Sequence, residues 1–135
     1  MKRVAVVLLA LCLVVVAYSC RDAVEPPPPP VDPSGFLRVS VTTDHADLGA
    51  LVVRIWGAPA ADSIRAAPGL TVYHGAAPSS VRVFVAGPIP ASGPILRFWT
   101  PDASVISDYQ VTVEDAAATS YEQRPVAEVR TSITR

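Results

Sequence analysis

The sequence predicts an all-β protein, an antiparallel β-sandwich of seven to nine strands that occupies residues 36–135. Three observations lead to this fold class. Apolar and polar residues alternate with a period of two in short segments, as they do when successive side chains point to opposite faces of a sheet. Proline or glycine separates these segments about every ten residues. No segment shows the apolar stripe that is typical of a helix.

The alternation defines the expected strands in chain order: residues 36–42, 51–56, 81–85, 95–99, 109–113 and 129–133. In the segment 95–99, Leu96 and Phe98 alternate with Ile95, Arg97 and Trp99. We therefore expect Ile95 on the outer face of the sheet, together with Arg97 and Trp99. Residues 60–67 are rich in alanine, but Pro68 ends them after about two turns, so they are expected to form a short strand or an irregular piece.

In size and strand number, the predicted domain resembles an immunoglobulin-like sandwich. The disulfide of antibody domains is excluded, because no cysteine follows Cys20. The segment from Ser79 through Gly93 to Thr100 also resembles the strand–turn–strand segments of cohesin-like sandwiches. It covers about 20 residues and carries no diagnostic motif, so the resemblance concerns the fold alone.

Residues 1–19 are typical of a secretory signal peptide. A basic start, Met1-Lys2-Arg3, is followed by an apolar run from Val4 to Ala17. A membrane-spanning helix needs about 20 apolar residues. An extension of the run to Cys20 approaches that length, so an uncleaved anchor is the alternative interpretation.

The run ends in Ala17-Tyr18-Ser19-Cys20, which resembles the lipobox of bacterial lipoproteins. Ser19 and Cys20 match the pattern, whereas Ala17 is smaller than usual and Tyr18 departs from it. The resemblance implies that Cys20 receives a diacylglycerol and becomes the new N-terminus, which anchors the protein to a membrane of the cell envelope. Arg21 stands where an Asp would retain a lipoprotein at the inner membrane, which favours the outer membrane. The alternative is cleavage near Ser19 by another signal peptidase, which would leave Cys20 as a free thiol.

Residues 20–35 form the expected tether between the anchor and the domain. Five consecutive prolines, 26–30, favour an extended polyproline II segment, which would be a stiff spacer of roughly 15 Å. A recognition site for a proline-binding module is the other interpretation of this segment.

The composition argues against several functional classes. The chain has a net charge of −1, and removal of Lys2 and Arg3 makes it −3, so a nucleic-acid partner is not expected. After residue 2 there is no lysine, the only histidines are His45 and His74, and no serine lies in a G-x-S-x-G motif. We therefore expect no enzyme activity, no catalytic residue and no cofactor.

The segment Asp44-His45-Ala46-Asp47 is the one cluster of metal-ligand residue types near the first strand. It is expected to be a polar loop, because Asp favours turns. A surface calcium site at Asp44 and Asp47 is the alternative, although the spacing of an EF-hand loop is missing. The sequence therefore predicts no metal site.

Arginine placement is the most unusual feature of the expected strands. Arg38, Arg54, Arg82 and Arg97 lie mid-strand, opposite in parity to the apolar residues, and two tryptophans share the parity of Arg54 and Arg97 on their own strands. If those two strands belong to one sheet, they form one candidate ligand-binding surface: Arg54, Trp56, Arg97 and Trp99. Arginine stacks on aromatic rings and binds carboxylates or phosphates with a planar fork. The alternative is that these arginines are solvent-facing residues that pair with Asp or Glu.

Together these features favour a membrane-anchored envelope lipoprotein whose β-sandwich binds a partner or has a structural role, without enzymatic activity. The expected partners are the membrane, through Cys20, and an envelope protein or a glycan. A carbohydrate-binding module that uses the Arg and Trp residues is the alternative, and an enzyme or enzyme fragment comes last.

Overall fold

A computed structural model describes residues 28–57 and 59–135, and this part of the chain confirms the predicted all-β sandwich. The predicted signal peptide, Cys20 and the first residues of the tether lie outside the described residues. The strands are β1 (Gly35–Thr43), β2 (Leu48–Trp56), β3 (Arg65–Ala66), β4 (Thr71–Ala77), β5 (Ser80–Ala86), β6 (Ser92–Thr100), β7 (Gln110–Ala118) and β8 (Val129–Thr134). Three single 3-10 turns join them: η1 (Ala61–Ser63), η2 (Ile106–Asp108) and η3 (Val126–Glu128).

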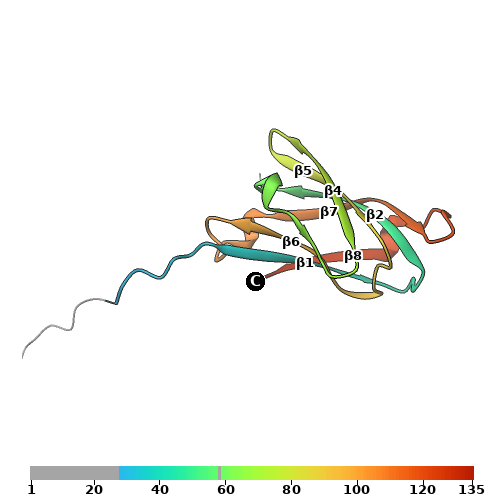
Figure 1. Cartoon of the computed structure of the whole chain (residues 1–135), viewed down its shortest axis with the longest axis horizontal. Helices are drawn as coiled ribbons and strands as arrows, with labels where there is room; N and C mark the ends of the chain where they lie inside the picture. The colour runs from blue at the N-terminus through green and yellow to red at the C-terminus, as the bar shows by residue number, and fades with distance from the viewer. Residues whose placement is uncertain (1–27, 58) are drawn as a thin grey trace, which may run out of the picture. The chain divides into compact units, whose positions relative to one another are not determined.

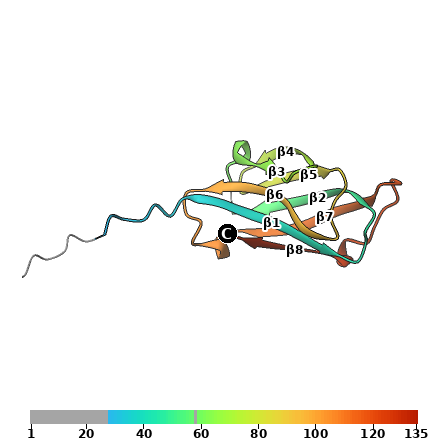
Figure 2. The ribbon, with the colours of Figure 1, turned by 60° about the horizontal axis from the view of Figure 1, so that its bottom comes forward.

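The strands form two antiparallel four-stranded sheets that pack face to face (Figures 1 and 2). Sheet A has the order β3-β6-β1-β8, and sheet B has the order β4-β5-β2-β7. The first two strands therefore lie in different sheets, whereas the first two strands of an immunoglobulin constant domain share one sheet. At one edge of the sandwich, β7 and β8 lie side by side, and Thr131 donates a hydrogen bond of 3.3 Å to the carbonyl of Val111.

The core lies between the sheets and follows the predicted alternation. Its fully buried side chains come from the inner faces of β1, β2, β5 and β6, and each contributes about 1.5–3 kcal/mol through removal from water. The largest are Phe98, Leu37, Leu48, Leu51, Ile55, Ile95 and Leu96. Phe98 packs against Tyr109, with ring centroids 5.2 Å apart, and the Tyr109 hydroxyl is 2.7 Å from Thr100 Oγ1. These contacts hold sheet A against the residue that immediately precedes β7.

The prediction that Ile95 lies on the outer face is wrong. Val39 pairs with Leu96, but Ser40 pairs with Pro94, so Ile95 is the extra residue of a β-bulge. A bulge breaks the strict alternation of a strand, and Ile95 is buried like Leu96. The outward positions of β6 beyond the bulge keep their expected parity.

Two elements lie outside the six expected segments. β4 is an exposed edge strand that ends in Gly75-Ala76-Ala77, so it has no apolar alternation that sequence reasoning could detect. Residues 60–67 form η1 followed by β3, in agreement with the expected short or irregular piece. Within residues 28–57 and 59–135, no helix is long and apolar enough to cross a membrane.

Candidate functional site

The four predicted binding residues do not form one surface. Arg54 and Trp56 lie on β2 in sheet B, whereas Arg97 and Trp99 lie on β6 in sheet A. The condition for a single Arg/Trp surface is therefore not met, and each pair belongs to a different outer face. Both tryptophans remain accessible, with Trp56 40% and Trp99 38% exposed.

On the outer face of sheet A, Trp99 is directly opposite Phe36 of the neighbouring strand β1. Phe36 is 46% exposed, so the two rings offer apolar surface to solvent side by side across the sheet. The backbone N–H of Trp99 donates to Ser63 Oγ over 3.0 Å, which ties this end of β6 to η1. We call Phe36 and Trp99 the aromatic pair.

Two residues further along the strands, on the same outer face, arginines form a row across sheet A. Arg97 of β6 is opposite Arg38 of β1 on one side and Arg65 of β3 on the other. The Arg97 guanidinium carbon lies 5.0 Å from the centre of the Phe36 ring, which links the row to the aromatic pair. We call Arg65, Arg97 and Arg38 the arginine row.

No carboxylate balances the arginine row within the part of the chain that the structure describes. The four strands of sheet A contain four arginines and no Asp or Glu. None of the three guanidinium groups forms an ion pair with another described residue. Arg65 donates from Nη1 to two backbone carbonyls, those of Asp62 at 2.7 Å and Ile64 at 2.9 Å.

A hollow of about 350 Å³ lies beside the arginine row. Arg38 and Arg97 form its polar side, and Pro68, Pro94 and Leu96 are among its apolar walls. Its shape depends on the bulge of β6 and on the turn after β3, where the N–H of Ala67 donates to the carbonyl of Ile95 over 2.9 Å. The site thus combines a concave apolar surface with two guanidinium groups.

The outer face of sheet B has a different electrostatic character, because both of its arginines contact one carboxylate. Glu114 of β7 accepts a hydrogen bond of 2.5 Å from Arg54 Nε, and its other carboxylate oxygen lies 2.5 Å from Arg82 Nε. The hydrogen bond from Arg54 holds the pKa of Glu114 below its ordinary value, with the charges of both arginines acting in the same direction. Arg54 also lies over the Trp56 ring, 5.5 Å from its centre.

Sheet B also exposes an aromatic surface of its own. Tyr73 of β4 is opposite Phe84 of β5, with ring centroids 6.4 Å apart. Next to them, Gly75 provides no side chain, and an open hollow of about 380 Å³ lies there, bordered by Tyr73, Phe84 and Arg82. Sheet B therefore presents an aromatic surface beside Arg82, which contacts Glu114.

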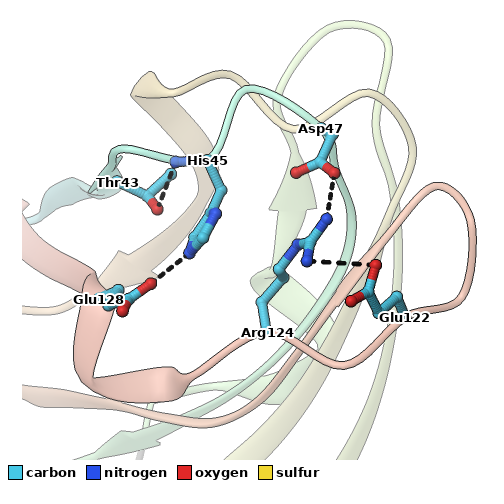
Figure 3. Close-up of polar contacts among 6 residues, drawn as sticks. All are labelled: Thr43, His45, Asp47, Glu122, Arg124 and Glu128. Carbon is cyan, nitrogen blue, oxygen red and sulfur yellow. Dashed lines mark hydrogen bonds and ion pairs between the residues drawn. The ribbon is translucent and has the colours of Figure 1, made fainter.

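At the end of the sandwich, a polar cluster joins the β1–β2 loop to the β7–β8 loop (Figure 3). Asp47 accepts a hydrogen bond from Arg124 over 2.6 Å, and Glu122 lies 3.3 Å from the same guanidinium. His45 contacts Glu128 at 2.5 Å. The Arg124 hydrogen bond holds the pKa of Asp47 below its ordinary value.

This cluster bears on the calcium alternative at Asp44 and Asp47. The Asp47 carboxylate is engaged by Arg124, a cation. Among the described residues, no group of three or more His, Cys, Asp or Glu side chains is placed to hold a metal ion. The β1–β2 loop thus makes structural contacts with the β7–β8 loop. Asp47 and Arg124 are 77 residues apart in the chain, and His45 and Glu128 are 83 residues apart, so no local sequence pattern predicts these contacts.

Comparisons with protein-family models, with curated proteins and with solved structures found no match. The function is therefore inferred from the outer faces of the two sheets. Of their residues, sequence reasoning identified Arg38, Arg97 and Trp99 but did not single out Phe36 or Arg65. The shared parity of Phe36 and Arg38 on one strand could have indicated that Phe36 faces outward. The place of Arg65 in the arginine row depends on the pairing of β3 with β6, which the sequence does not show.

Proposed function

We propose that this protein is a lipid-anchored protein of the bacterial cell envelope whose β-sandwich is a non-enzymatic binding module. The lipobox-like segment that ends in Cys20 supports the anchor, and the prolines 26–30 support a spacer between the membrane and the domain. With Arg21 after the cysteine, the outer membrane is the proposed location.

The observation that carries the binding role is the aromatic pair. A solvated strand face needs no large apolar side chains, yet Phe36 and Trp99 are paired across sheet A and both are more than a third exposed. Exposed aromatic residues that lie next to arginine are typical of recognition surfaces. The arginine row continues the same face, so the aromatic pair lies within a larger polar surface.

The anchor is tested by mass spectrometry of the mature protein produced with its own N-terminal segment. A diacylglyceryl mass on Cys20 and recovery in the membrane fraction are expected, and both should disappear in Cys20→Ala. Cys12→Ala is the matched control, because it removes the other cysteine of the chain and should leave the lipid in place. A mature protein that begins at another residue, or carries Cys20 without a lipid, contradicts the anchor.

A carbohydrate-binding module is the second candidate function, favoured by the accessible rings on both outer faces. Sugars present C–H faces that stack on aromatic rings, and arginines donate to their hydroxyl groups. Glycan pull-down with Trp99→Ala and Trp56→Ala compares sheet A with sheet B. Tyr121→Ala is a suitable control, because Tyr121 is 93% exposed in the β7–β8 loop, away from both rings. Unchanged retention in both tryptophan variants would exclude stacking on those rings.

A further inference from the structure

We infer that the outer face of sheet A is a binding site for an acidic glycan, with the arginine row binding its carboxylates and the aromatic pair stacking on its sugar rings. This inference names a ligand for the binding module proposed above and rests on that proposal, but it does not depend on the lipid anchor.

Charge is distributed unevenly between the outer faces of the two sheets. Sheet B has Arg54 and Arg82 on its outer face and places Glu114 in contact with both. Sheet A has Arg38, Arg65 and Arg97, and no described carboxylate forms an ion pair with any of them. If outward arginines served only solubility, the same balance would be expected on both faces.

The register of the arginine row places like charges next to each other. Like charges directly opposite each other on neighbouring strands destabilise a sheet, and Arg97 has such a neighbour on each side. The like charges therefore cost sheet A stability, and the contact of Arg97 with the Phe36 ring offsets part of that cost. A bound anion would remove the repulsion, because a carboxylate between two guanidinium groups accepts charge-assisted hydrogen bonds from both.

The geometry of the outer face of sheet A fits a glycan. Neighbouring strands lie about 4.8 Å apart, so the spacing of the arginines is comparable with the spacing of successive sugars in an extended chain. Phe36 and Trp99 are on the same face, two residues further along their strands, where they can stack on a sugar. The hollow of about 350 Å³ beside Arg38 and Arg97 has room for part of the ligand.

These features favour a glycan over a bilayer surface or a nucleic acid. A concave site between Pro68 and Pro94 receives a discrete group better than it meets a flat array of headgroups. The chain has a net charge of −1, so it lacks the general positive field by which proteins attract nucleic acid and anionic membranes. A local row of three arginines suits a ligand that contacts a few sugars.

The test is isothermal titration calorimetry of the full chain, purified in detergent from the fraction that contains it, with oligogalacturonate as the probe. The fully methyl-esterified oligogalacturonate is the matched control, because it keeps the sugar rings and removes the negative charges. We expect binding of the free acid, with affinity at least about tenfold lower for the ester, for Arg97→Ala and for Arg38→Ala. Arg82→Ala removes an arginine from sheet B, leaves the Arg54–Glu114 contact, and should change the affinity less than about twofold.

Further measurements and controls complete the test. Circular dichroism and thermal melts establish that each variant is folded. Arg97→Lys keeps the positive charge but removes the planar guanidinium, so it separates the contributions of these two features to binding. Equal binding of the ester and the free acid would overturn the inference while leaving glycan binding intact. Binding confined to vesicles of phosphatidylcholine with phosphatidylglycerol, binding confined to oligothymidylate, or no binding by any probe would overturn it as well. The acyl mass on Cys20, measured on the same sample, reports on the anchor separately.

Discussion

Replacement of Arg38 and Arg97 by threonine, singly and together, should show that the two wild-type arginines destabilise each other. They are directly opposite on neighbouring strands, with no described carboxylate in contact with either. Cross-strand pairs are worth roughly 0.2–1 kcal/mol, and like charges act against folding by a similar amount. Threonine suits these positions because it is polar and has a high strand propensity.

The single variants do not report this repulsion cleanly, so the measurement is a double-mutant cycle. Arg97→Thr also loses the contact with the Phe36 ring, worth about 0.5–1 kcal/mol at an exposed site, which offsets the relief of charge. The cycle cancels that loss and leaves the coupling between the two side chains. In a domain of about 100 residues, a coupling of 0.2–1 kcal/mol corresponds to a shift of roughly 1–8 °C in Tm.

Differential scanning calorimetry at two salt concentrations checks the cause. The Debye length falls from about 8 Å at 0.15 M salt to about 3 Å at 1 M. The destabilising coupling should therefore be largest at low salt and shrink at 1 M salt. A coupling that is zero, that stabilises the wild-type pair, or that does not change with salt would refute the repulsion. The register of the arginine row would then give no reason to infer an anion site.

Three other predictions concern the stability of the sandwich. Phe98→Ala should lower the free energy of unfolding by about 3–5 kcal/mol in urea titrations, because the ring is fully buried, whereas Phe84→Ala, at a 41% exposed position, should cost much less. The pKa of Glu114 is lowered in the folded protein, so its contribution to stability is present above its ordinary pKa of 4.5 and is lost as the pH falls through the lower folded pKa. Glu114→Gln should therefore flatten the acid limb of a profile of Tm against pH. An unchanged acid limb would contradict this prediction. Gly57→Ala should lower the free energy of unfolding by about 1–3 kcal/mol in the same urea titrations. Gly57 has a φ of 99°, and a Cβ at this position would lie 2.4 Å from the backbone oxygen of Asp108. At Gly75 a Cβ meets nothing within 4 Å, so Gly75→Ala is the control for that substitution.

The candidate site could be predicted in part from parity. Arg97 and Trp99 were expected on an outer face, and they lie there, because the alternation of β6 places Phe98 in the core between them. The bulge at Ile95 could not be predicted, because an isoleucine is equally suited to a core position and to a strand face, and the choice depends on the partner strand.

The sheet to which each strand belongs could not be predicted either. Trp56 and Trp99 have the same local pattern, so either one sheet or two was compatible with the sequence. Pairing is decided by contacts between distant segments: β1 pairs with β6 and β8, and β2 pairs with β5 and β7. The arginine row and the Arg54–Glu114–Arg82 contacts both follow from this pairing.

The local pattern of apolar and polar residues was thus enough to predict the all-β class and six of the eight strands. It is informative because the side chains of a strand alternate between water and core wherever one face is buried. Composition was enough to expect a tether before the domain. The order of strands in each sheet, the edge strand β4 and the neighbours of each arginine required the tertiary structure. They depend on which faces pack together and on the register between strands, and such long-range contacts leave no signature in the neighbouring residues.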